Sequence, residues 1–157
     1  MADTMLGRLA RWLRILGYDT AYEKVIADSV LIERVIGENR WLLTRDRYLA
    51  QRHVLRDRHT VVISDHLDGQ LRQLHRDLKI NLDMNHPREY RCADCNEQLV
   101  AIPREEAVSR VPPHVAEENC QFMRCRRCDR LYWPGTHWMN IRRQLARLAK
   151  EPPVLHP

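Results

Sequence analysis

The sequence predicts an α/β domain built on a parallel sheet, followed by a small zinc-binding module. Two observations lead to this prediction. Over residues 1–82, short apolar segments of strand character alternate with amphipathic helical segments, an alternation typical of parallel sheets. The pairs "CADC" and "CRRC" then lie on either side of residues 96–124. Two Cys-x-x-Cys pairs at such a separation are typical of a structural zinc site.

The chain opens with an amphipathic helical pattern. In "MLGRLARWLRILG", leucine and tryptophan side chains repeat at helical spacing on one arc, while Arg8, Arg11 and Arg14 occupy another. Gly17 marks the end of this helix, because glycine readily adopts the left-handed conformation that follows a last turn. The segment "DTAYE", residues 19–23, is expected to be a short strand.

The alternation continues through the rest of the α/β part. Asp28 stands where it can N-cap a helix over "SVLIERVIGEN", closed by Gly37 and Asn39. "RWLLT" predicts a buried strand of a parallel sheet, and "RDRYLAQRH" predicts a polar turn and helix. "HTVVIS" predicts the third strand, and "DGQLRQLHRDL" a further amphipathic helix.

The pattern breaks at "NLDMNHPREY", which predicts a boundary between two modules. We expect an α/β domain over residues 1–82 and a linker over 83–90. A zinc ribbon should occupy residues 91–150 and end in a basic helix, "MNIRRQLARLA". The proline-rich residues 151–157 are expected to form a flexible tail.

Composition limits the class of protein. Hydrophobic residues make up 44% of the chain and charged residues 30%, and no apolar run is long enough to span a membrane. With no signal-type segment, the sequence predicts a cytoplasmic protein. Because disulfides are rare in that compartment, paired cysteines there indicate metal ligands. The net charge of +5 comes with many arginines, which suit phosphate contacts, although a GC-rich genome would also favour arginine codons.

The cysteine pairs predict a closed metal site. Two knuckles that each supply two thiolates complete a tetrahedron and leave no position for water or substrate, so the zinc is expected to be structural. Cys120 is left over and receives no role. The predicted ligands are Cys92, Cys95, Cys125 and Cys128.

Basic and aromatic residues surround the second knuckle. Arg126 and Arg127 lie inside it, and Trp133 and Trp138 follow it. Arginines interleaved with aromatic rings suit phosphate contact and base stacking, which predicts RNA binding. The alternative is that the two tryptophans pack against the basic helix as a small core.

The α/β part carries a set of acidic residues at the ends of predicted elements. Asp3 precedes the first helix, Asp28 begins the second, and Asp46 and Asp65 each follow a strand. Carboxyl ends of parallel strands meet at one edge of a sheet, where a few carboxylates can hold Mg²⁺ or Mn²⁺. Thr44 and Arg45 could orient water or phosphate beside Asp46. The alternative reading is that each aspartate caps a helix.

Three stretches of the sequence, "DTMLGRLARWLRILGYDT", "WLLTRDR" and "RCADCNEQL…RCRRCDRLYWPGTHW", together resemble the Mut-7 C-terminal RNase family. The resemblance implies a PIN-like nuclease domain, with the parallel sheet of a Rossmann-like fold, joined to a zinc ribbon. It further implies a metal-dependent ribonuclease whose acids are Asp3, Asp28 and Asp46. Asp65 fits the last acidic position best, and Asp68 is the alternative.

The resemblance also implies RNA contacts by the arginines of the first helix; the alternative is a solvated helix face. Two features depart from the family. Its members carry an apolar strand before the first aspartate, whereas only Met1 and Ala2 precede Asp3 here. Asp3 is therefore expected on a loose terminus, with the first strand of the sheet incomplete. Ser29 also stands where the family often has a second acidic residue, which lowers the expected metal affinity.

Two functions follow from these patterns. The first is a Mg²⁺- or Mn²⁺-dependent ribonuclease whose zinc ribbon aids RNA binding. The second is a non-catalytic RNA-binding or adaptor protein with a degenerate acidic site. A toxin-like nuclease is a weaker third reading, because no segment suggests an element that binds an inhibitor protein.

Overall fold

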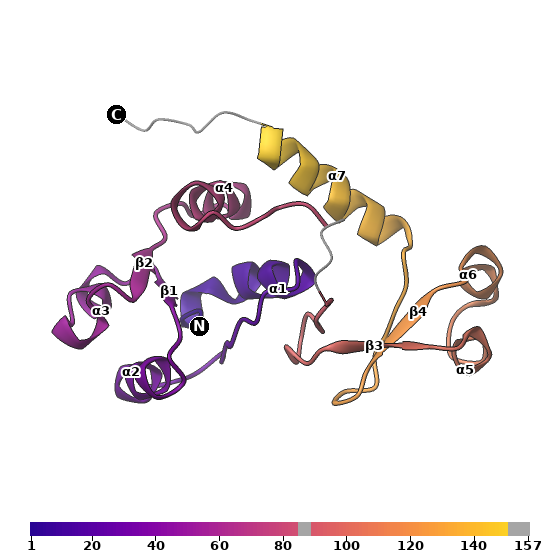
Figure 1. Cartoon of the computed structure of the whole chain (residues 1–157), viewed down its shortest axis with the longest axis horizontal. Coiled ribbons are helices and arrows are strands. Elements are labelled where there is room, and N and C mark those ends of the chain that lie inside the picture. Colours follow the sequence, from indigo (N-terminus) through magenta and orange to yellow (C-terminus); the bar gives the residue numbers. More distant parts are fainter. Residues whose placement is uncertain (85–88, 151–157) are drawn as a thin grey trace.

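The computed structural model describes residues 1–84 and 89–150 (Figure 1). The predicted tail, residues 151–157, lies outside the described residues, as do residues 85–88 of the predicted linker. In the described part, no helix is both long and apolar enough to cross a membrane.

A small parallel sheet organises the N-terminal part, as predicted. β1 (Leu42–Thr44) pairs in parallel with β2 (His59–Val61). On the other side of β1, Ala2 forms parallel bridges to both Leu43 and Tyr22. The expected strand over residues 19–23 is thus reduced to a bridge at Tyr22, and the first residues of the chain lie between it and β1.

The expectation that Asp3 sits on a loose terminus is wrong. Met1, Ala2 and Asp3 are all buried. The Leu43 N–H donates to the Met1 carbonyl over 2.8 Å, and the Asp3 N–H donates to the Leu43 carbonyl over 3.0 Å. Two flanking partners hold this short segment in the middle of the sheet, so length alone does not decide whether a segment is anchored.

Helices cover the sheet and supply its core. The first turn after Asp3 is a 3₁₀ helix, and the other helices follow the predicted order, with bounds that differ from the predicted ones by a few residues. Leu9, Leu13, Leu71 and Leu74 bury the apolar faces of the first and fourth helices against each other. The elements are η1 (Thr4–Leu6), α1 (Gly7–Ile15), α2 (Asp28–Gly37), α3 (Arg47–Ala50), η2 (His53–Leu55) and α4 (Leu67–Leu78).

The cysteine-bearing part is an antiparallel sheet of order β3-β4-β5. Its strands are β3 (Leu99–Ile102), β4 (Phe122–Cys125) and β5 (Leu131–Tyr132). Two short helices, α5 (Arg104–Ala107) and α6 (Pro113–Glu118), interrupt the connection from β3 to β4. The sequence analysis did not predict them, because helices this short carry too few turns to show a periodicity.

The last helix, α7 (Thr136–Lys150), begins before the predicted segment and returns to the α/β part. It runs from the ribbon past α1 to α4 (Figure 1). Ile141, Leu145 and Leu148 are buried, as predicted, and they belong to the same core cluster as the leucines of α1 and α4. The helix assigned to the ribbon therefore completes the core of the α/β part, while the predicted domain boundary stays a prediction.

Arg14 joins α1 to the first cysteine knuckle. It is only 4% exposed. Its Nε donates to the Thr20 carbonyl over 2.8 Å, and its Nη1 donates to the carbonyls of Ala93 and Asp94 over 3.0 and 2.9 Å. Burial lowers the pKa of this guanidinium, yet it remains charged at physiological pH. A buried charge is tolerated here because carbonyl oxygens accept hydrogen bonds from it.

We predict that Arg14→Met destabilises the folded chain by about 2–4 kcal/mol, because three carbonyls, two of them in buried residues, lose a charged donor. Urea unfolding of the zinc-loaded protein measures the change. Arg8→Met is the matched control, since Arg8 is exposed on the same helix and its loss should shift stability by less than about 0.5 kcal/mol. Equal unfolding midpoints for the two variants would contradict the role assigned to Arg14.

Candidate functional site

Three of the four predicted acids line one small pocket. Asp3, Asp28 and Asp46 border a cavity of about 60 Å³. Asp3 follows the bridge residue Ala2, and Asp46 follows β1, so both leave the carboxyl edge of the parallel sheet. Asp28 reaches the same place as the first residue of α2. The fold thus gathers carboxylates from three separate segments.

The Asp3 carboxylate is held in place by three donors. Its Oδ1 accepts from the Met5 N–H over 2.9 Å, and its Oδ2 accepts from the Arg45 N–H over 3.1 Å. Oδ2 also accepts from the hydroxyl of Thr44, a fully buried side chain. Such bonds fix the side-chain rotamer, and Oδ1, which accepts only one of them, keeps a lone pair for another partner.

Thr44 also fixes the neighbouring acid. Its Oγ1 accepts from the Asp46 N–H over 2.9 Å, so one hydroxyl connects two acids of the pocket. Asp46 Oδ1 in turn caps α3, accepting from the N–H groups of Tyr48 and Leu49 over 2.7 and 3.1 Å. Within the described part of the chain, Asp46 Oδ2 makes no hydrogen bond. Asp46 is therefore a helix cap and a pocket residue at once.

The expectation that Asp28 N-caps its helix is wrong. The N-cap of α2 is Ala27, and Asp28 is the first helical residue, without a side-chain capping bond. The backbone enters the helix one residue earlier than the sequence suggests. Asp28 is exposed and still benefits from the positive end of the helix dipole.

The structure separates the two candidates for the last acidic position. Asp65 is exposed and forms an ion pair with Arg45, whose backbone N–H holds Asp3. Asp68 instead accepts from Gln144 and pairs with Arg147 over 3.0 Å, which joins α4 to α7. Neither lines the pocket. Only Asp65 is connected to it, through Arg45.

The donor set of the pocket fits a hard cation. Carboxylate oxygens are what Mg²⁺ and Mn²⁺ prefer, and few protein ligands are needed because water completes the shell. The three carboxylates are spread more widely than the cysteine sulfurs. Among the described residues, only the cysteines form a metal-ligand group whose atoms all lie within 4.8 Å of one another.

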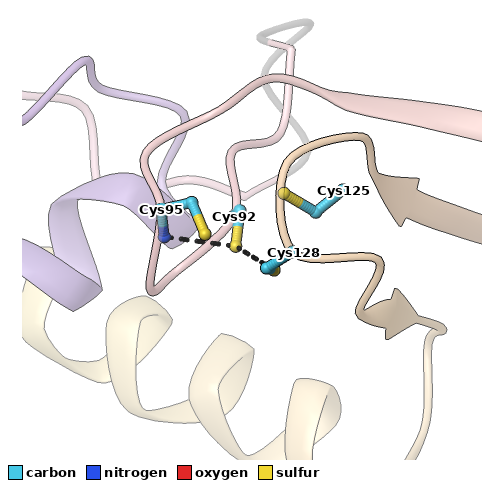
Figure 2. A group of neighbouring side chains, drawn as sticks. All are labelled: Cys92, Cys95, Cys125 and Cys128. Atoms are coloured by element: carbon cyan, nitrogen blue, oxygen red, sulfur yellow. Dashed lines mark hydrogen bonds between the residues drawn. The ribbon is translucent and has the colours of Figure 1, made fainter.

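The four predicted cysteines do come together. Cys92 and Cys95 come from one knuckle loop and Cys125 and Cys128 from the other, and their side chains gather in the space between the loops (Figure 2). The Cys92 and Cys128 sulfurs are 3.7 Å apart. Tetrahedral zinc with bonds of about 2.3 Å requires sulfurs about 3.8 Å apart. The group can therefore hold a metal ion such as zinc.

The surroundings of the sulfurs match a metal site. Burial, with the neighbouring Cys128 and Cys92, raises the pKa of Cys95 to about 12. A metal ion bound by these sulfurs requires thiolates, so its binding releases the thiol protons. The Cys95 N–H donates to the Cys92 sulfur over 3.3 Å, and the Tyr132 hydroxyl lies 3.0 Å from that sulfur. Cys120 is exposed and outside the group.

The predicted RNA contacts fall into three environments. Arg8 and Arg11 are exposed on α1, and Arg126 and Arg127 are exposed in the second knuckle. Thr44 and Arg45 lie beside the acidic pocket, where Thr44 is buried and Arg45 half-buried. Arg14 is buried and bonded to carbonyls, so we leave it out of the proposed contacts with RNA.

The sequence analysis missed the residues that shape the knuckles. Asn96 and Asp129 each follow a Cys-x-x-Cys pair and adopt left-handed backbone conformations, with φ of 66° and 59°. The Asn96 side chain accepts from the Thr20 N–H over 2.9 Å, which connects the first knuckle to the segment that follows α1. The sequence pattern that could have predicted these turns is an Asn or Asp directly after each Cys-x-x-Cys pair, because these residues tolerate positive φ.

Comparison with curated proteins found no match, and comparison with solved structures found none. A protein-family model does match. The model describes the Mut7-C RNAse domain, and it covers residues 1–145, from the buried N-terminal segment through most of α7. The matched region therefore includes the acidic pocket, both cysteine knuckles and α1, whose Arg14 binds the first knuckle. The chain belongs to the Mut7-C RNase domain family.

Proposed function

We propose that this protein is a metal-dependent ribonuclease that hydrolyses RNA phosphodiester bonds at the acidic pocket. Membership of an RNase domain family indicates a nuclease role. The observation that carries the proposal is the meeting of Asp3, Asp28 and Asp46 in one pocket at the carboxyl edge of the sheet. We place Asp65 as the outer acid, because it is tied to the pocket through Arg45.

The three pocket acids would hold Mg²⁺ or Mn²⁺. Such an ion supplies activation of water and neutralises charge that builds on the phosphate during in-line attack. Hydrogen bonds from the Thr44 hydroxyl and the Arg45 N–H hold the Asp3 carboxylate in one orientation. The bond by which Asp46 caps α3 holds the Asp46 side chain in place. Arg45 is half-buried and pairs with the exposed Asp65, so the exposed end of its guanidinium would be the part that contacts a phosphate oxygen.

The proposal also assigns a structural zinc to Cys92, Cys95, Cys125 and Cys128, in a ribbon attached to a PIN-like domain. Four protein ligands leave no open coordination position, so the zinc would stabilise the ribbon and take no part in hydrolysis. Exposed Arg126 and Arg127 on the second knuckle, and Arg8 and Arg11 on α1, would contact RNA phosphates. Unpaired cysteines clustered in this way favour a reducing compartment, the cytoplasm.

Asp46→Asn should lower RNA cleavage in Mg²⁺ or Mn²⁺ by at least about 100-fold, because losing a direct ligand costs more than losing a residue that orients one. Asparagine caps helices as well as aspartate does, so the fold should persist. Asp77→Asn is the matched control, since Asp77 pairs with Arg76 on α4, away from the pocket. Cleavage of a labelled single-stranded RNA measures the rates.

Two results would overturn the nuclease proposal at this pocket. One is equal cleavage by the native chain and Asp46→Asn. The other is an absence of cleavage by both, with RNA still bound, which would favour the non-catalytic RNA-binding protein.

Thr44→Val should lower cleavage by about 10–100-fold, as expected when a group that orients two acids is lost. Valine fills the same space without the hydroxyl that donates to Asp3 and accepts from Asp46. Thr44→Ser keeps the hydroxyl and should retain most activity. If Thr44 had only a structural role, Thr44→Val and Thr44→Ser should lose stability and activity to a similar extent. Titration of Mn²⁺ separates the two cases, since a positioning role raises the Mn²⁺ concentration needed for half-maximal rate.

Cys125→Ser should abolish stoichiometric zinc binding, because a buried member of the four-sulfur group is removed. Cys120→Ser should bind zinc like the native chain, since Cys120 is exposed and lies outside the group. Elemental analysis of the purified proteins gives the metal content, and thermal unfolding gives the stability. One zinc per chain in both variants would contradict the assigned ligand set.

A further inference from the structure

A second cavity, of about 510 Å³, lies between the cysteine ribbon and the helices α1, α6 and α7. Its size falls in the range of small-molecule and cofactor sites, roughly 300–1,000 Å³. None of the four pocket or outer acids lines it. It is therefore separate from the proposed hydrolytic site.

Aromatic rings form much of the cavity lining. Tyr90, Tyr132, Trp133 and Trp138 all border it and are half-buried. Tyr90 and Trp138 pack edge to face with ring centroids 4.9 Å apart, and the Tyr132 hydroxyl lies against the Cys92 sulfur. Trp133 rests on a small cluster that includes Phe122. Partly exposed rings held by such contacts can stack with a planar ligand at little cost in entropy.

The charge at this cavity suits an anion. Arg11, Arg91 and Arg130 line it, whereas Glu118 is the acidic residue among its lining. Asp94 forms ion pairs with Arg11 and Arg130 at the edge of the cavity. Both arginine side chains remain more than half exposed, so a phosphate can reach their remaining donors.

A groove along α1 leads from this cavity toward the acidic pocket. The groove, of about 350 Å³, is lined by Arg8 and shares Arg11 and Ala93 with the cavity. At its other end lies Tyr22, whose hydroxyl donates to the Thr4 carbonyl over 3.2 Å, and Thr4 borders the acidic pocket. Nine residues of α1 span roughly 14 Å at 1.5 Å per residue, a distance that a few nucleotides of extended strand cover.

We propose that the aromatic cavity binds an unpaired nucleobase of an RNA strand whose backbone follows Arg8 and Arg11 to the acidic pocket. This inference rests on the proposed function for its substrate class, RNA, and adds that the bound RNA must be single-stranded. In a duplex the faces of the bases are stacked on one another and cannot enter a protein cavity. The rings of the cavity, Trp133 in particular, would supply stacking surface that does not depend on base identity.

The test compares two labelled probes of equal length and charge, a short oligouridine and its abasic counterpart. Both are titrated by fluorescence anisotropy against the full zinc-loaded chain carrying Asp46→Asn, without added Mg²⁺ or Mn²⁺. Oligouridine should bind at least about 5-fold more tightly than the abasic probe, the effect of one stacked base. A fully paired hairpin of the same strand length should bind more weakly than oligouridine.

Substitutions locate the effect. Trp133→Leu should remove most of the preference for bases, and Trp133→Phe should keep it. Trp41→Leu is the matched control, because Trp41 is a half-exposed tryptophan that does not line this cavity, and its replacement should leave both affinities unchanged. Arg130→Ala should lower the affinity for both probes by the same factor. If Trp133→Leu loses zinc or helical content, Trp133→Phe and Arg130→Ala with the two probes still decide the question.

Equal affinity for the two probes would overturn the inference, as would an unchanged preference in folded Trp133→Leu. Either result would leave the cavity to a different class of ligand, such as a protein segment. Failure here is distinct from failure of the proposed function. Full cleavage activity in Asp46→Asn would overturn the hydrolytic site without affecting the base preference, and loss of the preference would leave the hydrolytic site standing.

Discussion

The buried guanidinium of Arg14 is the constraint on which the arrangement of the molecule depends. It lies between α1 and the first cysteine knuckle, and the carbonyls of Thr20, Ala93 and Asp94 accept hydrogen bonds from it. A charge taken out of water is tolerated only while those acceptors are in place, so the two segments are stable in one relative position. That position sets the groove along α1, and with it the distance between the acidic pocket and the aromatic cavity.

The acidic pocket depends on the hydrogen bonds that anchor the first residues of the chain. A segment of three residues, Met1–Asp3, is anchored because it has a hydrogen-bonded neighbour on each side. Asp3 then emerges at the sheet edge already surrounded by N–H and hydroxyl donors from Met5, Thr44 and Arg45. Preorganised donors of this kind reduce the reorganisation that a reaction at the site would require.

Much of the fold could be predicted from local patterns. The apolar spacing of α1, α4 and α7 showed which faces are buried, and the cysteine spacing showed which sulfurs meet. Arg14 could not be distinguished from Arg8 and Arg11, because all three lie on the polar arc of one helix. The carbonyls that bury Arg14 belong to Ala93 and Asp94, far along the chain. Periodicity likewise identified the buried face of α7 without revealing that its partners are α1 and α4.

The return of α7 to the first core has a consequence for how the protein is made. Leu145 and Leu148 complete the apolar cluster of α1 and α4, so that cluster stays partly open until the whole ribbon has been synthesised. Closing a loop that contains the ribbon is entropically less costly once the knuckles are compact. The core of the first part and the fold of the ribbon are therefore coupled, since α7 can complete that core only after the ribbon has been synthesised.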